Sequence, residues 1–337
     1  MANNNFKPFA TAGAANVMAQ ADYESLAALL TGFQSGTAQS QQLNKVWRQS
    51  SIMAAVLAQF IVDLTGQDAI DDGTTATLLA NLKMAVQAQS AAVIGQARNV
   101  SMSVTAASSS ATLSADEIVV GTALGGQKYL LKQFSKTINL ATAGAGGMDT
   151  GSAPVSGYVA LYAIYNPTTG TSALLAKNAT SAVQPNVYSG ANMPAGYTAS
   201  ALISVWPTNS SGQLVIGYQT DRLISLPYAS IANTSSQIAA LTALSISSFV
   251  PPNARSVSGF MNIASSNSSN SSVNIASSAS AIGQQQSSCS GTSAGGLLAS
   301  SSFNSLALLT SQTVYWSASS ASGTFTSAAI FMSAYTI

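Results

Sequence analysis

The sequence predicts an α+β chain that is mainly β, with a helical N-terminal region, a middle antiparallel β-domain and a C-terminal β-sandwich. Apolar residues recur at helical spacings up to about Ile94, whereas strand-like segments separated by Gly, Pro and Asn turns follow from about Val100. Period-two alternation then dominates the end of the chain. The predicted regions are 1–99, 100–235 and 251–337, with a linker at 236–250.

Three helices are predicted in the first region. A short one starts at Asp22 and stops before Gly32, and another starts near Thr74 after an acidic turn. The helix between Ser40 and Thr65 has the clearest periodicity, with apolar residues at three-, four- and near-heptad spacings. Its stripe is a candidate oligomerisation or attachment surface, and an intramolecular core is the alternative, because the heptads are few. The stripe consists of Leu43, Trp47, Met53, Leu57, Ile61 and Leu64.

The middle region is expected to form a mostly antiparallel sheet. Good turn signals occur at 166–170 and 207–212, where Pro, Asn and Gly cluster. Residues 231–245 are expected to form a short connecting helix. The predicted strands are 117–120, 128–131, 137–140, 157–165, 201–206 and 213–218.

The last region carries no Asp, Glu, Lys or Arg after Arg255, yet its apolar residues alternate with polar ones from Ser256 to Ile263. This alternation predicts strands of a small β-sandwich with hydroxyl-rich outer faces. Trp316 is assigned to the core. The remaining aromatic residues suit a carbohydrate ligand if they face outward, and the candidate receptor-contacting residues are Phe303, Tyr315 and Tyr335.

Composition narrows the class of protein. Charged residues make up 6% of the chain, against about 25% in typical soluble domains, so charge-poor surfaces are expected to be buried against other chains. The net charge of +1 offers no footprint for nucleic acid. The longest apolar stretch, 52–64, is too short to span a bilayer, and the residues after Met1 do not resemble a signal sequence. Cytoplasmic synthesis without membrane insertion is therefore expected.

No catalytic, cofactor or metal site is predicted. The chain has no histidine and only Cys289, which excludes a histidine triad and an intrachain disulfide. A glycosidase needs two carboxylates, but after Glu117 the only acids are Asp149 and Asp221. Asp221 is expected to pair with Arg222. The acidic residues before Gly73 do not follow calcium-loop spacing and are expected to cap the next helix.

Several long segments resemble tail-fibre proteins of Mu-like and related myophages and prophages. They touch all three regions, which makes the resemblance more specific than a short motif. The N-terminal segments are 6–10, 43–55 and 71–76, the middle ones 161–167 and 192–200, and the C-terminal ones 250–254 and 313–316.

The resemblance implies an elongated homotrimeric fibre in a virion tail, with no enzymatic activity. Its N-terminal helices would dock on the baseplate or on an adjoining fibre protein, and its C-terminal tip would contact a host-envelope glycan such as lipopolysaccharide. The chain lacks the repeat shaft and the chaperone-like tail of the longest fibres. A tripod component, a tail decoration or a purely structural baseplate protein therefore remains an alternative, in an infectious phage or a headless contractile bacteriocin.

Overall fold

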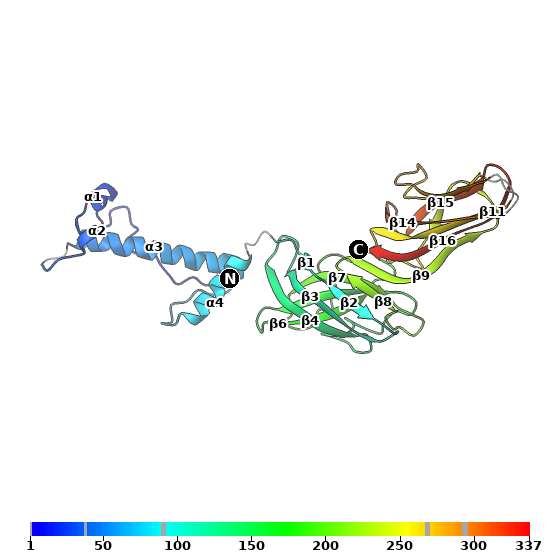
Figure 1. Cartoon of the computed structure of the whole chain (residues 1–337). Coiled ribbons are helices and arrows are strands. Elements are labelled where there is room, and N and C mark those ends of the chain that lie inside the picture. The colour runs from blue at the N-terminus through cyan, green and yellow to red at the C-terminus, as the bar shows by residue number, and fades with distance from the viewer. Residues whose placement is uncertain (1, 37–38, 89–91, 267–269, 292–295) are drawn as a thin grey trace. The chain divides into compact units, whose positions relative to one another are not determined.

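The computed structural model describes residues 2–36, 39–88, 92–266, 270–291 and 296–337. The chain forms two compact units. Met1–Ala91 with Gly125–Tyr129 makes the first, here called the helical unit, and Ala92–Leu124 with Leu130–Ile337 makes the second, here called the β unit. Most of the regular structure is β, as predicted (Figure 1).

The helical unit is built around one long helix. The predicted helix between Ser40 and Thr65 is confirmed, and it ends at Gly66, whose φ of 65° provides a left-handed cap. The predicted helix from Asp22 to Gly32 is instead two short helices. The helices are α1 (Gln20–Glu24), α2 (Ala28–Thr31), α3 (Ser40–Thr65) and α4 (Ala76–Ala88).

The N-terminal segment and α4 cover part of α3. The side chain of Asn4 donates to the carbonyl of Ala55 at 3.2 Å, and the amide of Phe9 donates to the hydroxyl of Ser51 at 2.8 Å. A small core forms where the C-terminal half of α3 meets α4. Its residues are Ala58, Ile61 and Ala69, with Phe6, Val62, Leu78 and Leu82 packed against them.

The β unit consists of antiparallel strands. In the described ranges, twelve strands make one sheet in the order β14-β11-β16-β9-β8-β2-β3-β7-β5-β6, with β1 and β4 also paired to β3. The bounds are β1 (Ala97–Arg98), β2 (Ser101–Val104), β3 (Ser110–Gly121), β4 (Lys128–Asn139), β5 (Tyr158–Asn166), β6 (Thr171–Asn178), β7 (Ala199–Pro207), β8 (Gly217–Thr220), β9 (Leu223–Thr234), β11 (Ser256–Ser266), β14 (Gly296–Ala307) and β16 (Thr324–Thr336).

A second sheet of four strands packs on the C-terminal part of the first. Its order is β10-β15-β12-β13, and its strands β12 and β13 contact β11 and β14. The two faces bury Met261 and Ile330 from one sheet and Val273 and Trp316 from the other, which confirms the core position predicted for Trp316. The strands are β10 (Ile238–Ser245), β12 (Asn270–Ala276), β13 (Gln285–Ser290) and β15 (Thr313–Ser320).

The connecting helix expected at 231–245 is wrong. Residues up to Thr234 continue β9, and Ile238–Ser245 form β10, which pairs with β15. The partly buried residues of β10 are spaced by three, which mimics a helical period. A register shift between Ile238 and Thr242 accommodates that spacing in the strand, so tertiary pairing overrides the local pattern.

The C-terminal strand is tied to the middle of the chain by a buried hydrogen bond. The hydroxyl of Tyr335 donates to the carbonyl of Val205 at 2.6 Å, and the ring is 1% exposed. Burial raises the pKa of this tyrosine well above its ordinary value, so the phenol stays protonated as a donor.

We expect Tyr335→Phe to lower the free energy of unfolding of the β unit by about 1–2 kcal/mol, because the change removes a buried donor without changing ring packing. Urea unfolding followed by circular dichroism measures it. Tyr228→Phe, at a residue 66% exposed, is the control and is expected to unfold like the wild type. Identical midpoints for both variants would show that the buried bond contributes nothing.

Candidate functional site

Two of the three predicted receptor-contacting aromatic residues lie in the interior. Phe303 and Tyr335 are 0% and 1% exposed, so the predicted surface position is wrong for both. Tyr315 on β15 is half-buried. The structure therefore does not bring the three rings together on one surface.

Phe303 is buried because it fills the space above a glycine. Gly259 on β11 pairs with Phe303 on β14, and a Cβ at Gly259 would lie 2.9 Å from the tip of the Phe303 ring. A register shift between Val257 and Gly259 sets this pairing. The missing side chain thus makes room for a ring that the sequence pattern placed outside.

Tyr335 is buried because a bulge reverses the alternation of β16. Ser258 pairs with Ala334 and Gly259 with Met332, which leaves Ser333 as an extra residue on β16. One extra residue turns all following side chains to the other face. Phe331 therefore faces outward, whereas Tyr335, four residues later, faces the core.

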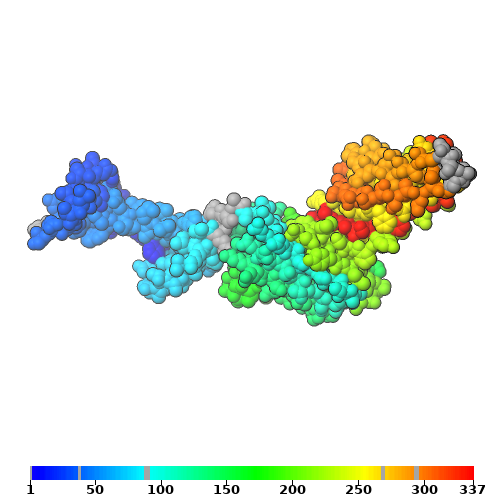
Figure 2. All heavy atoms as spheres, viewed as in Figure 1, coloured from blue at the N-terminus to red at the C-terminus, as the bar shows by residue number. Residues whose placement is uncertain are grey.

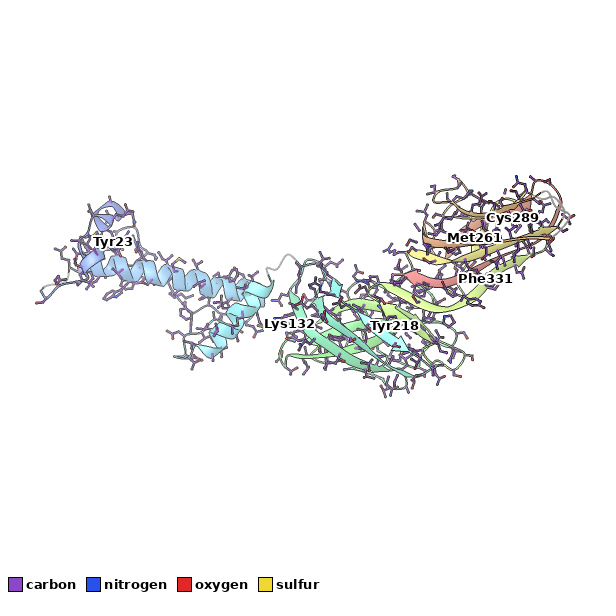
Figure 3. All side chains as sticks on the ribbon, in the orientation of Figure 1. Tyr23, Lys132, Tyr218, Met261, Cys289 and Phe331 are labelled. Atoms are coloured by element: carbon purple, nitrogen blue, oxygen red, sulfur yellow. The ribbon has the colours of Figure 1, made fainter. Side chains whose placement is uncertain are left out.

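Three other aromatic side chains gather on the outer face of the large sheet. Phe260 on β11 and Phe331 on β16 stack with their centroids 4.6 Å apart and their planes at 10°. Tyr228 on β9 meets them edge-on, at 5.5 Å from Phe260 and 5.9 Å from Phe331. We call these three residues the aromatic patch. Figure 3 labels Phe331 on this strand and Met261 on its neighbour.

The aromatic patch is accessible and is bordered by hydroxyl groups. Tyr228 is 66% exposed, and Phe260 and Phe331 are half-buried. Across the strands, Phe260 pairs with Ser302, and Phe331 pairs with Ser230. All five residues come from strands whose side chains are uncharged from Leu223 to Thr234 and after Arg255. These strands appear from green-yellow to red in Figure 2.

This arrangement suits a neutral ligand with both apolar and hydroxyl faces. Stacked rings offer a flat apolar surface, and serine hydroxyls both donate and accept hydrogen bonds. The alternation from Ser256 to Ile263 placed Phe260 on the outer face. The patch itself could not be found from that pattern, because its members are 32 and 71 residues apart along the chain.

Tyr315 lies on the smaller sheet, away from the aromatic patch. It pairs with Ala243 and Ala276, and polar side chains follow two residues on along its strand. There the amide of Asn274 donates to the hydroxyl of Ser317 at 3.1 Å, and Gln284 donates to Asn274 at 3.1 Å. Tyr315 is therefore the one predicted contact residue that keeps an accessible ring.

The acidic residues of the β unit have structural partners. The hydroxyl of Tyr188 donates to Asp149 at 2.8 Å; burial and then this bond raise the pKa of Tyr188 to about 12. The carboxylate of Asp221 accepts the amide of Val100 at 3.0 Å. Arg222 donates to the carbonyls of Gly95 and Leu202 instead of pairing with Asp221, which corrects the predicted ion pair.

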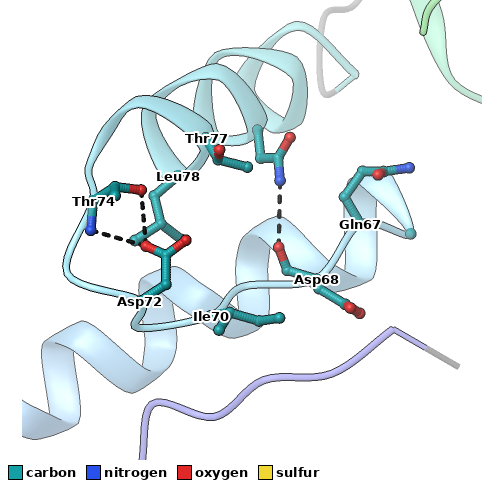
Figure 4. Close-up of a pocket in the computed structure, with 9 residues that line it drawn as sticks. Gln67, Asp68, Ile70, Asp72, Thr74, Thr77 and Leu78 are labelled. Carbon is teal, nitrogen blue, oxygen red and sulfur yellow. Dashed lines mark hydrogen bonds between the residues drawn. The ribbon is translucent and has the colours of Figure 1, made fainter.

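A hollow of about 350 Å³ lies where the acidic turn enters α4 (Figure 4). Asp72 accepts bonds from the amide and the hydroxyl of Thr74, both at 2.8 Å, and the hydroxyl bond is the main reason why the pKa of Asp72 is lowered. Asp68 accepts the amide of Asn3 at 2.7 Å. The acidic side chains thus organise the turn before the helix, as the sequence predicted for its start.

The structure divides the predicted stripe of α3. Ile61 belongs to the core of the helical unit, and Trp47 packs edge-on against Phe9 with centroids 5.9 Å apart. Met53 and Leu57 are 59% and 47% exposed. Only part of the stripe therefore offers a free apolar surface.

Two searches of the geometry concern other kinds of site. Among the described residues, no three His, Cys, Asp or Glu side chains are placed to hold a metal ion. Within the same ranges, no helix is long and apolar enough to cross a membrane.

No family model and no curated protein matches the chain. Among solved structures, it is similar to a tryptic core variant of Cry1Da from Bacillus thuringiensis, with 10% identity and a TM-score of 0.17. The match covers 76% of this chain and 54% of the other, so the chain spans about half the length of that structure. A likeness this weak carries no argument about fold or function.

Proposed function

We propose that the chain is a structural, non-enzymatic tail-fibre subunit of a contractile-tail particle. In this proposal it is a homotrimer in the virion tail, its helical unit attaches to baseplate or adjoining fibre proteins, and its C-terminal strands bind a host-envelope glycan such as lipopolysaccharide. The resemblance of its segments to tail fibres of Mu-like phages supports the assignment. The aromatic patch on an uncharged, hydroxyl-bordered face is the observation that carries the binding role.

The chemistry of the aromatic patch favours a sugar over a charged ligand. Sugar rings present C–H groups on one face and hydroxyl groups around the edge, which match the stacked rings of Phe260 and Phe331 and the serines beside them. A face without charge gains little from electrostatic attraction, so binding is expected to depend weakly on salt. Each contact is weak by itself.

Repetition makes such weak contacts effective. In a homotrimer three copies of the patch bind one polymeric surface, and linked sites can raise overall binding by about a hundredfold or more without any new contact. The exposed residues Met53 and Leu57 on α3 provide an apolar surface at the other functional region, suited to protein contacts. The two surfaces support separate roles in assembly and in recognition.

Adsorption competition tests the proposal. The purified full chain is added to cells of the bacterium that the particle infects, before the particle, and unadsorbed particles are counted. We expect the chain to leave most particles free, because it occupies the surface glycan. A folded chain that leaves adsorption unchanged would favour the purely structural baseplate protein. Cells stripped of surface polysaccharide serve as the control, on which the chain is not expected to be retained.

A further inference from the structure

We infer that α3 joins copies of this chain through a parallel seam of three heptads, on a side of the helix that its own unit leaves open. The inference rests on the proposed homotrimer and names the surface that forms it. The seam follows alternating steps of three and four residues. It consists of Leu43, Val46, Ser50, Met53, Leu57, Phe60 and Leu64.

The seam is distinct from the face that the N-terminal segment covers. Ala55 and Ser51 accept bonds from Asn4 and Phe9 on that covered face. Each residue turns an α-helix by about 100°, so Met53 and Leu57, both two residues from Ala55, lie about 200° from it, on the opposite side. Packing within the unit therefore leaves this side unused.

The solvent exposure of α3 agrees with this division. Ala55 and Ala58 are 9% and 3% exposed, whereas Met53 and Leu57 on the seam are 59% and 47% exposed. Val56 beside them is 56% exposed. A run of large apolar side chains left in water on one helix is a typical protein interaction surface.

The spacing indicates another helix of the same kind as the occupant. Apolar residues every 3.5 residues are the pattern of coiled coils, in which each helix presents the same seam to its neighbours. The seam covers 22 residues of α3, from Leu43 to Leu64, whereas α4 has 13 residues and packs on Ala58 and Ile61 beside the seam. A second copy of α3 matches the seam in both length and period.

Charge does not oppose self-association along the seam. None of its seven residues is charged, and the nearby Lys45 is 4% exposed, with its ammonium group over the ring of Tyr23. Like charges from different copies therefore do not meet in the seam. An uncharged surface of this kind is complementary to itself.

Ser50 indicates the parallel direction. In an antiparallel pair centred on the seam, Ser50 of one copy would face Leu57 of the other, and its hydroxyl would be buried against an apolar side chain. In a parallel, in-register assembly, Ser50 faces Ser50, and the hydroxyl groups can bond to one another. A single polar layer of this kind sets the register of a coiled coil.

Cysteine cross-linking of the full chain tests the seam. Cys289 is first replaced by Ser, and then Ser50→Cys is compared with Ile52→Cys under copper–phenanthroline oxidation. Ile52 is the matched control, because it is 39% exposed and lies off the seam. We expect linked chains on a non-reducing gel for Ser50→Cys and few for Ile52→Cys. Adding Met53→Glu to Ser50→Cys should lower the yield by about tenfold, and adding Ile52→Glu should not.

The oligomeric state separates failure of the seam from failure of the proposed function. Light scattering of the same proteins gives their mass in solution. A folded trimer in which Ser50→Cys remains unlinked overturns the seam and leaves the homotrimer standing. A chain that stays monomeric at all concentrations overturns both.

Discussion

Replacing Gly259 with Ala is expected to prevent β11 from pairing normally with β16. An added Cβ would lie 1.9 Å from the carbonyl oxygen of Phe331 and 2.9 Å from the Cα of Met332. These are backbone atoms of a strand in the middle of the sheet, so they cannot move aside as a side chain would. We expect the free energy of unfolding of the β unit to fall by about 3 kcal/mol or more, the upper end for an overpacked core.

Gly296→Ala is the matched control for this substitution. Gly296 also lies in this sheet, on β14, but a Cβ there would meet nothing closer than the carbonyl oxygen of Ser265 at 3.9 Å. Urea unfolding and soluble yield are measured for both variants. If the two alanine variants unfold at the same urea concentration, the close approach at Gly259 has no energetic consequence.

Removing the aromatic patch is expected to have the largest effect on adsorption competition. Tyr228→Ser with Phe331→Ala removes the exposed ring and half of the stacked pair. Each copy loses binding free energy, and the loss is multiplied in a trimer, so about tenfold or more protein should be needed for the same competition. Counting unadsorbed particles over a range of protein concentrations measures this shift.

Two further variants make the result specific. Leu309→Ser changes an apolar side chain that is 60% exposed and outside the patch, and it should compete like the wild type. Tyr315→Ser alters the outer face of the smaller sheet. If Tyr315→Ser weakens competition and the patch variant does not, recognition belongs to the smaller sheet and the assignment to the patch is wrong. Circular dichroism confirms that every variant is folded.

Local pattern was sufficient to predict the elements whose partners lie nearby. The apolar spacing between Ser40 and Thr65 gave both ends of α3, because helical bonds join residues four apart and Gly66 ends the helix. Alternation from Ser256 to Ile263 likewise predicted β11 and the inward side of Met261. Trp316 was correctly placed in the core.

The positions of Phe303 and Tyr335 could not be predicted, because they depend on register between distant strands. A glycine on one strand makes room for Phe303, and an extra residue at Ser333 reverses the side on which Tyr335 lies. The same bulge leaves Phe331 outside, where β9 brings Tyr228 beside it. Alternation is a property of one strand, whereas a binding surface of a sheet is a property of several.

Strand β9 determines how the β unit transmits a mechanical pull. Its first residues pair with β8, and the strand pairs with β16 from Leu223 to Thr234. The C-terminal strands are thus a continuation of the middle sheet. Tension applied at the aromatic patch passes into that sheet through many hydrogen bonds that share the force, so rupture requires them to shear together. Such a connection yields abruptly at high force and stretches little before it does, which suits a protein that holds a particle to a moving cell.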